Sequence, residues 1–375
     1  MSEIAHAVLS ASGSTQWLSC PGSRKAQEGY EDKSSVFAVE GSRAHELADI
    51  CLKDGGDAQG LLGEEIMGED IPQEMCDYVQ EYLDYVRSFE GGNTKLFTEQ
   101  RVDFSNVVEG GFGTLDAAVL EYDTGLCHIF DLKYGKGVSV FAFENTQAQL
   151  YALGILNDLG WMDAIKSFRI HIVQPRKDST TTWDVTVKEL ELFAAFATER
   201  SELAMTDSAP RVPGEKQCEW CKAKADCGVL ATFVEETIMA EFDDLNLDDP
   251  KKIGNNRKKT IIDNKKLIEK FLDAVEASIF EEINDGGTFP GYKLVHGRSN
   301  RKWSADAEEF LIEKLGDTAY KRKLLTITDA EKLLGKGKLD EFTVKPEGKP
   351  TLAPESDKRD AINDDVTDEF GIIPD

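Results

Sequence analysis

The sequence lacks the features that would place the protein in a membrane or in an export pathway. No run of about 18 apolar residues occurs, so we expect no membrane-spanning helix. The first residues, from Met1 to His6, do not show the charged and then apolar pattern of a signal peptide. We therefore expect a cytoplasmic protein, in a compartment that keeps thiols reduced.

Positive charge is also scarce. The chain has 43 Lys and Arg against 70 Asp and Glu, which gives a formal net charge of −27. Such a balance argues against a protein that binds nucleic acid over its whole surface, because such proteins are usually basic. A local basic patch governs binding more than the total charge does. Part of the acidity is concentrated in residues 235–249 and 357–375, which need not touch a polyanion.

The length of 375 residues leaves room for two or three domains. We expect a core over residues 1–230, an acidic linker over 231–254, and an accessory region with a long helix (255–285) and a β-hairpin over 255–342. The hairpin should contain a strand at 292–298. The acidic end at 343–375 has little apolar content and is expected to be disordered.

The most informative stretch runs from Gly113 to Tyr151. Alternating apolar residues on both sides of Tyr122-Asp123-Thr124-Gly125 predict a β-hairpin with a four-residue loop. Folding the hairpin symmetrically about this loop places Asp116 directly opposite Asp131, with Cβ atoms roughly 4.5–5.5 Å apart.

Two carboxylates in that position repel unless something neutralises them. A divalent ion with oxygen ligands, Mg²⁺ or Mn²⁺, would do so. Lys133 lies on the same strand face as Asp131, where it could stabilise developing negative charge or position a water. This combination suits phosphodiester hydrolysis. The alternative is an ordinary solvated hairpin face.

The segments around this hairpin predict a mixed α/β fold. We expect helices near residues 42–53, 73–89, 145–156 and 188–206, and further strands at 95–104, 167–174 and 181–187. His45 borders the apolar stripe of the first helix. We interpret it as a metal ligand, with a hydrogen-bonded residue at the edge of the core as the alternative. Gln147 and Tyr151 are four residues apart, so they project from one helix face. We expect this face to point toward the site, with a half-buried face at the edge of the core as the alternative.

The cysteines give a second signal. Cys218, Cys221 and Cys227 form a tight cluster, which in a reduced compartment indicates a metal site rather than disulfides. Cys20 is the best fourth ligand because it lies in a short turn before the core. Four thiolates suit either an iron–sulfur cluster or structural Zn²⁺. The three remaining cysteines fall on apolar faces and are interpreted as packing residues: Cys51, Cys76 and Cys127.

Taken in order, these motifs resemble the RecB-type branch of the PD-(D/E)xK nucleases. Residues 41–45, with His45, resemble its first motif. Asp116 followed by Asp131-Leu132-Lys133 resembles the PD-(D/E)xK signature, and Gln147-xxx-Tyr151 resembles the QxxxY motif. The cysteine pattern resembles that of the iron–sulfur subgroup. The resemblance covers residues 15–230 and is closest to phage and prophage nucleases.

The resemblance implies a restriction-endonuclease-like sheet flanked by helices. It implies a metal held by His45, Asp116, Asp131 and the Leu132 carbonyl, with Lys133 supporting the attacking water. Gln147 and Tyr151 would contact DNA. A [4Fe–4S] cluster would be held by Cys20, Cys218, Cys221 and Cys227, with Zn²⁺ as the alternative.

The function that follows is a metal-dependent deoxyribonuclease. We expect an exonuclease that acts in phage recombination, repair or replication in the bacterial host cytoplasm, with DNA and phage recombination or replication proteins as partners. Basic and aromatic residues that could supply a local DNA-binding surface, or could simply be solvated, are Lys136, Arg257, Lys258, Arg298, Arg301, Lys302 and Trp303. The alternative is a non-catalytic DNA-binding or assembly protein that keeps the fold.

Overall fold

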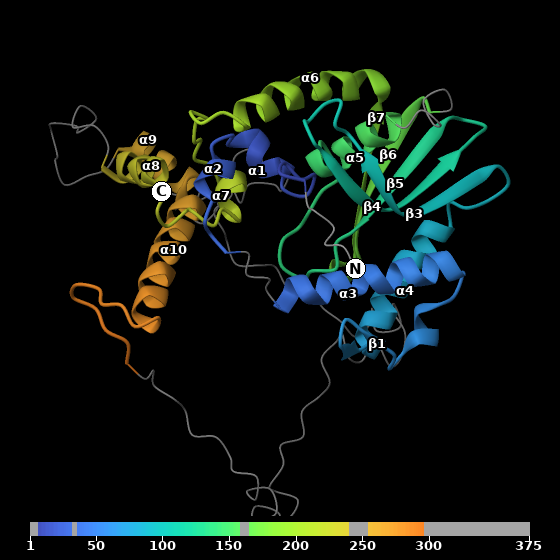
Figure 1. Cartoon of the computed structure of the whole chain (residues 1–375), viewed down its shortest axis with the longest axis horizontal. Helices are drawn as coiled ribbons and strands as arrows, with labels where there is room; N and C mark the ends of the chain where they lie inside the picture. The colour runs from blue at the N-terminus through green and yellow to red at the C-terminus, as the bar shows by residue number, and fades with distance from the viewer. Residues whose placement is uncertain (1–6, 32–35, 158–164, 240–253, 296–375) are drawn as a thin grey trace, which may run out of the picture. The chain divides into compact units, whose positions relative to one another are not determined.

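A five-stranded mixed sheet is the centre of the fold, as the sequence predicted. The computed structural model describes residues 7–31, 36–157, 165–239 and 254–295 (Figure 1). The strand order is β3-β4-β5-β6-β7, and every neighbouring pair is antiparallel except β5–β6, which is parallel. The strands are β3 (Thr94–Asp103), β4 (Phe112–Glu121), β5 (Leu126–Leu132), β6 (Ser167–Gln174) and β7 (Ser179–Thr186).

The parallel pair requires a crossover, because parallel neighbours cannot be joined by a tight turn. Helix α5 (Thr146–Asn157) provides it. Strand β5 is buried along almost its whole length, as expected for a central strand covered on both faces. The chain therefore leaves the end of β5 at Leu132, forms a loop and enters α5 above the sheet.

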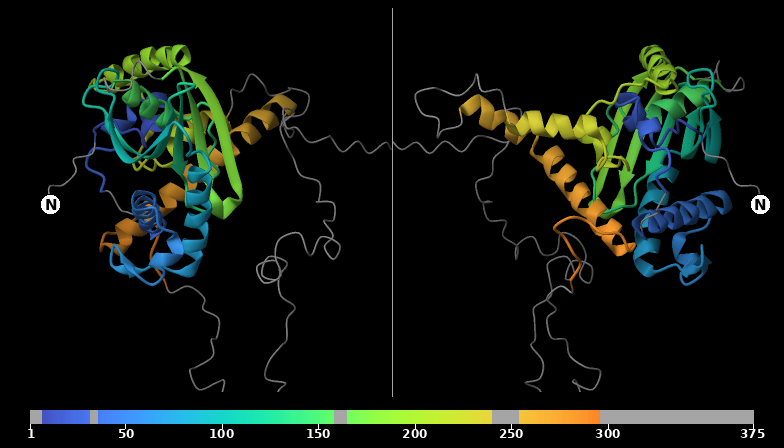
Figure 2. Two further views of the ribbon diagram at one scale, coloured as in Figure 1. Left: turned by 90° about the vertical axis from the view of Figure 1, so that its right-hand side faces the viewer. Right: turned by 60° about the vertical axis from the view of Figure 1, so that its left-hand side comes forward.

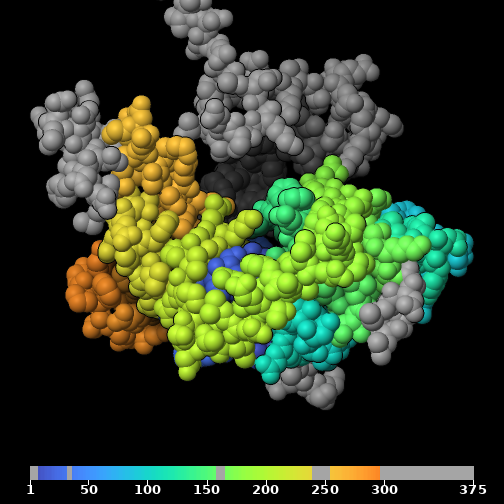
Figure 3. Space-filling model, turned by 90° about the horizontal axis from the view of Figure 1, so that it is seen from above, coloured from blue at the N-terminus to red at the C-terminus, as the bar shows by residue number. Residues whose placement is uncertain are grey.

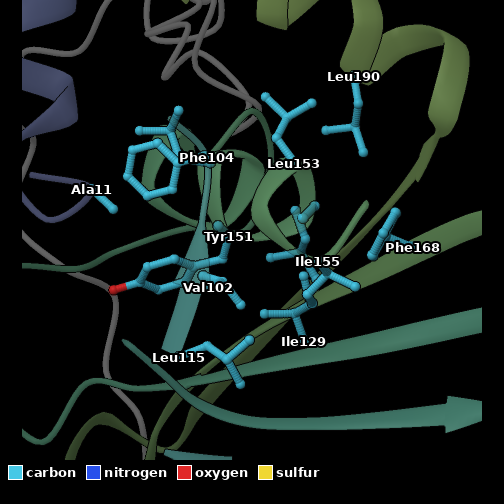
Figure 4. Packing of buried hydrophobic residues seen from close by; sticks show 14 of the residues in the cluster. Ala11, Val102, Phe104, Leu115, Ile129, Tyr151, Leu153, Ile155, Phe168 and Leu190 are labelled. Carbon is cyan, nitrogen blue, oxygen red and sulfur yellow. The ribbon is translucent and has the colours of Figure 1, made fainter. Parts of the chain in front are cut away.

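Two helical layers cover the sheet (Figure 1; Figure 2). One core cluster joins α5 and α6 (Val187–Ala204) to one face, through side chains such as Ile129, Tyr151 and Phe168 (Figure 4). The other cluster joins α3 (Val36–Asp54) and α4 (Gln73–Arg87) to the opposite face, through Phe130 and Leu132. The alternation of Ile129, Phe130 and Leu132 follows from the two-residue period of a strand.

Shorter elements complete the described chain. Near the N-terminus, α1 (Ser14–Ser19) and α2 (Ser23–Ala26) pack against α6. Beside the α3/α4 layer lie η1 (Ala58–Leu61), β1 (Glu65–Ile66) and β2 (Glu69–Asp70). After the sheet come η2 (Pro175–Lys177), α7 (Glu215–Glu219), α8 (Gly228–Met239), α9 (Asn255–Asp263) and α10 (Lys265–Asn284). Among the described residues, no helix is both long and apolar enough to cross a bilayer.

The N-terminal segment packs against residues about 200 positions later. The Gln16 side chain donates to the Gln217 carbonyl at 3.1 Å, and the Gly22 amide donates to the Pro210 carbonyl at 2.9 Å. Figure 3 shows the blue N-terminal residues between yellow-green residues from this later part of the chain. This contact brings Cys20 to the later cysteines.

Three predictions about the region after the core need correction, and others lie outside the described residues. Helix α8 continues to Met239, so the first part of the predicted linker is helical. The predicted helix 255–285 is broken at Asn264 into α9 and α10. Residues 292–295 do not form the predicted strand. The rest of that strand and the acidic end lie outside the described residues, as do Arg298, Arg301, Lys302 and Trp303.

A chain of hydrogen bonds crosses the α4 side of the sheet. The Tyr85 hydroxyl lies 2.9 Å from His171 Nδ1, His171 Nε2 lies 2.9 Å from His128 Nδ1, and His128 Nε2 lies 3.0 Å from Glu121 Oε1. Aromatic rings of Phe89 and others pack around both imidazoles. Burial lowers the pKa of His171 to about 3, so this imidazole is neutral at physiological pH.

The buried imidazole predicts a loss of stability in mild acid. The unfolded chain binds a proton at His171 near pH 6.5, and the folded chain binds it only near pH 3. The contribution of neutral His171 to the free energy of unfolding is therefore fully present above pH 6.5 and is lost as the pH falls toward 3. We expect this residue to cost about 2–3 kcal/mol between pH 6.5 and 4.5. His171→Gln keeps hydrogen-bonding groups without that titration and should flatten the profile of unfolding free energy, measured with urea at each pH. An equally steep profile in the variant would contradict this assignment.

Candidate metal centre and cysteine-lined cavity

Asp116 and Asp131 occupy facing positions, and the predicted register is confirmed. The ladder between β4 and β5 runs from Glu121↔Leu126 to Ala117↔Phe130, so the two aspartates are the next residues on each strand. At this point a side chain replaces the backbone as acceptor, because Asp116 Oδ2 accepts a hydrogen bond from the Leu132 amide at 2.7 Å. Both carboxylates therefore lie where the two strands stop pairing.

His45 reaches this point from helix α3. Its Nδ1 lies 3.1 Å from Asp116 Oδ1. The helix packs its apolar side on the sheet through Ala44, Leu47 and Ala48, and His45 borders that side. The structure thus brings together the histidine and the aspartate that the sequence placed about 70 residues apart.

On the other side of the aspartates, Lys133 connects to α5. Its Nζ lies 3.0 Å from Asp131 Oδ1 and donates to Gln147 Oε1 at 3.1 Å. Gln147 Nε2 in turn donates to the Tyr151 hydroxyl at 3.0 Å. The Tyr151 ring is part of the core while its hydroxyl points away from that cluster (Figure 4). A Cβ added at Gly113 would meet this ring at 2.7 Å, so glycine leaves room for it.

The charges of the cluster offset one another. Burial opposes the charged imidazole, but the Asp116 carboxylate outweighs it and the pKa of His45 is raised. Burial also opposes the charged forms of Asp116 and Lys133. Even so, His45 and Lys133 lower the pKa of Asp116, and the two aspartates raise the pKa of Lys133. For Asp131, burial outweighs the nearby ammonium and the pKa is raised. The aspartates therefore have unequal proton affinities.

The sequence did not identify Glu99, which lies opposite Asp116 in the register of β3 and β4. Its φ of 41° is in the left-handed region, which is uncommon for a residue other than glycine and interrupts the ladder. Burial, followed by the charges of Asp116 and Asp49, raises the pKa of Glu99 to about 7. The pattern of alternating residues in β3 carries no signal for this, because eight residues separate β3 from β4 and leave their register open.

The donor set fits a hard divalent cation. Asp131 is only 4% exposed, and its Oδ2 accepts no well-directed hydrogen bond, although Lys133 Nζ lies 2.8 Å away. Carboxylate oxygens suit Mg²⁺ or Mn²⁺, and the His45 imidazole would be an additional ligand of a kind more usual for Zn²⁺ or iron. Within the part of the chain that is described, no three His, Cys, Asp or Glu side chains are already arranged around one ion position. Binding would require His45 and Lys133 to release the carboxylates they now contact.

The four predicted cysteines line one small, partly open cavity, together with Arg211. They are Cys20, Cys218, Cys221 and Cys227. The Val212 amide donates to Cys20 Sγ at 3.2 Å. Burial raises the pKa of Cys20 and Cys218, and that of Cys221 to about 11. The packing role predicted for the other three is confirmed, since all are buried away from this cavity: Cys51, Cys76 and Cys127.

The described residues predicted to contact DNA are not gathered into one patch. Lys136 Nζ lies 2.7 Å from Glu74 Oε1, in an exposed ion pair. Arg257 is half-buried and Lys258 is exposed, both on α9, which packs against α8 and α10. Their contact with DNA stays a prediction.

The fold and the polar cluster together define a mixed α/β protein with facing carboxylates, a lysine and a histidine at the end of two central strands. A family model described as "Protein of unknown function (DUF2800)" matches residues 6–360. The chain therefore belongs to that family.

Two solved structures are distantly similar. The crystal structure named "Putative exonuclease" from Eubacterium rectale is 13% identical, with a TM-score of 0.32 over 52% of this chain and 79% of that one. The protein SSO0001 is 15% identical, with a TM-score of 0.24 over 58% of this chain and 85% of that one. Likenesses this distant transfer no activity to this chain.

Removing the lysine should leave a buried charge without compensation. Lys133→Met takes away the ammonium next to the buried Asp131, so we expect the unfolding free energy to fall by about 3 kcal/mol at pH 7 in EDTA. Lys136→Met removes a lysine from an exposed pair and should cost less than about 1 kcal/mol. Urea unfolding of both variants tests this. Equal losses would mean that Lys133 does not compensate Asp131.

Proposed function

We propose that this protein is a metal-dependent deoxyribonuclease. The observation that carries the proposal is the continuous cluster from His45 through the facing aspartates and Lys133 to Gln147 and Tyr151, assembled from two helices and two strands. On an ordinary solvated hairpin face, Asp131 would not be buried and its neighbours would not form a continuous series of hydrogen bonds. The motif resemblance to RecB-type nucleases supports the same reaction.

The residues have separate roles in this proposal. Asp116, Asp131, His45 and the Leu132 carbonyl would hold Mg²⁺ or Mn²⁺. The ion supplies Lewis acidity to a water and to the scissile phosphate. Lys133 positions the attacking water and offsets negative charge that develops on the phosphate. Gln147 and Tyr151 fix the lysine through their hydrogen bonds and meet the DNA backbone.

The likeness to phage and prophage nucleases supports an exonuclease that acts at DNA ends in recombination, repair or replication, in the cytoplasm of a bacterial host. Phage recombination or replication proteins are its proposed partners. Because the net charge is −27, DNA would have to bind where cations are locally concentrated. Lys177, which follows β6, is one such cation. Lys136 follows β5 but pairs with Glu74, and Arg176 is buried in ion pairs with Glu40 and Glu74.

Replacing the buried aspartate tests the enzymatic proposal. Asp131→Asn should reduce Mg²⁺- or Mn²⁺-dependent degradation by at least about 100-fold, because the charge that would hold the ion is lost. The matched control is Asp123→Asn, an aspartate in the turn of the same hairpin. End-labelled linear DNA and closed circular DNA are digested in parallel, and loss of the linear form alone would identify an exonuclease. A wild-type protein that binds DNA without degrading either form would instead support a non-catalytic DNA-binding or assembly protein.

For the cysteine-lined cavity we propose a [4Fe–4S] cluster, with structural Zn²⁺ as the alternative. The four thiols line one cavity, and the resemblance of the cysteine pattern to that of iron–sulfur nucleases supports the cluster over Zn²⁺. The cluster would join the N-terminal segment at Cys20 to α7 at Cys218. Its role would be to hold the two ends of the core together.

Loss of one ligand should remove the cluster. Cys221→Ser is expected to abolish the brown colour of anaerobically purified protein and its bound iron and labile sulfide, measured by elemental analysis. Cys51→Ala, a buried cysteine outside the cavity, should retain both. Stoichiometric zinc without iron in the wild type would identify the structural Zn²⁺ site instead.

A further inference from the structure

The connection from β5 to α5, which joins Lys133 to Gln147 of the polar cluster, presents two aromatic rings to solvent. Phe141 is 60% exposed and Phe143 is 68% exposed, and Val138 on the same connection is 53% exposed. Single exposed apolar residues are common on proteins. Two large rings two residues apart, on the loop that starts at Lys133 and leads into the helix of Gln147, form a local surface that needs an explanation.

The loop that carries these rings is held in place. The Val140 amide donates to Gln174 Oε1 at 2.9 Å, and Gln174 Nε2 donates to the Val138 carbonyl at 3.1 Å. The Ala142 amide donates to Thr181 Oγ1 at 3.0 Å, and Ala142 itself is fully buried between the two exposed phenylalanines. The rings are therefore displayed by an anchored backbone, and little conformational entropy would be lost on binding.

A third ring extends this surface. Phe143 packs edge to face on Trp183 of β7, with ring centroids 5.7 Å apart. Trp183 packs against the same core cluster as Ile129 and α5, so Phe143 lies on the α5 side of the sheet. Phe143 precedes Gln147 by four residues, which limits their separation to about 14 Å.

The chemical surroundings favour nucleic acid over an apolar protein partner. Lys177 Nζ donates to the Gly137 carbonyl at 3.1 Å, and Lys136 of the same loop is exposed while it pairs with Glu74. Aromatic rings interspersed with lysines, adjoining a proposed phosphodiester-cleaving site, are the arrangement by which proteins hold unpaired bases: the rings stack on the bases and the cations track the phosphates. Paired bases in a duplex keep their faces covered and offer no such contact.

We propose that Phe141 and Phe143, backed by Trp183, form a base-stacking platform that makes single-stranded DNA the substrate this site prefers. The inference rests on the proposed nuclease function, because it assigns the form of DNA that the same cluster receives. The platform would hold unpaired bases against the loop while the sugar-phosphate backbone of the same DNA strand reaches Asp131 and Lys133.

Binding without cleavage tests the platform. The full-length protein is titrated in EDTA into labelled oligo-dT and into a labelled duplex of equal length, followed by fluorescence anisotropy. We expect the wild type to bind oligo-dT more tightly than duplex. Phe141→Ala combined with Phe143→Ala should weaken oligo-dT binding at least about fivefold and leave duplex binding unchanged. Phe280→Ala, which removes an exposed ring on α10, is the matched control and should change neither.

The outcomes separate this inference from the nuclease proposal. Equal binding of single strands and duplex by the wild type, or unchanged oligo-dT binding by the double variant, would overturn the platform even if Mg²⁺-dependent cleavage is observed. Phe-dependent binding of oligo-dT in a protein that cleaves no DNA would support the platform and overturn the nuclease. Phe141→Trp with Phe143→Trp should retain the preference, because tryptophan also stacks.

Discussion

A buried and a half-buried aspartate lie next to each other where β4 and β5 stop pairing, and the polar centre of the protein depends on how their charges are compensated. Asp116 is held by the Leu132 amide and by His45, and Asp131 is held by Lys133. A buried ionised carboxylate is costly unless it is paired and hydrogen-bonded. The sequence alone suggested that only a bound ion could make this proximity tolerable. The structure adds a lysine and a histidine that also compensate the pair, and the bound ion stays a proposal.

The topology explains why these partners are available. The single parallel pair, β5–β6, forces the chain through a crossover helix, and α5 therefore lies over the face to which Asp131 belongs. Helix α3 covers the opposite face and reaches Asp116 through His45. The cluster thus forms at the strand ends, where both helical layers can supply side chains. The same crossover provides the loop that displays Phe141 and Phe143.

A second constraint ties the ends of the described chain together. The N-terminal turn at Cys20 meets α7, and α10 packs on the same region through an apolar cluster that includes Cys218, Leu267 and Ile268. Ion pairs join Lys266 to Glu215 and Lys270 to Glu219. The cysteine-lined cavity therefore lies between the N-terminal segment and the helices that follow the sheet. A group bound there would strengthen contacts that already exist.

The sequence by itself determined the local features. Alternating residues around a four-residue turn predicted the register that makes Asp116 face Asp131, and helical spacing put Gln147 and Tyr151 on one face. Both follow from short-range geometry, which a few neighbouring residues specify. It also predicted which cysteines gather, although only from their spacing and a resemblance.

Only the tertiary structure decided the rest. The left-handed Glu99 opposite Asp116 and the Lys133–Gln147 hydrogen bond depend on segments that meet after folding. The break of the long helix at Asn264 was not predicted either. Nothing in the stretch 255–285 distinguished one helix from two, because its apolar spacing is helical throughout. The pairing of β3 with β4 and the contact of α3 with the sheet are long-range. Their free energy comes from burial shared among distant residues, which no local pattern records.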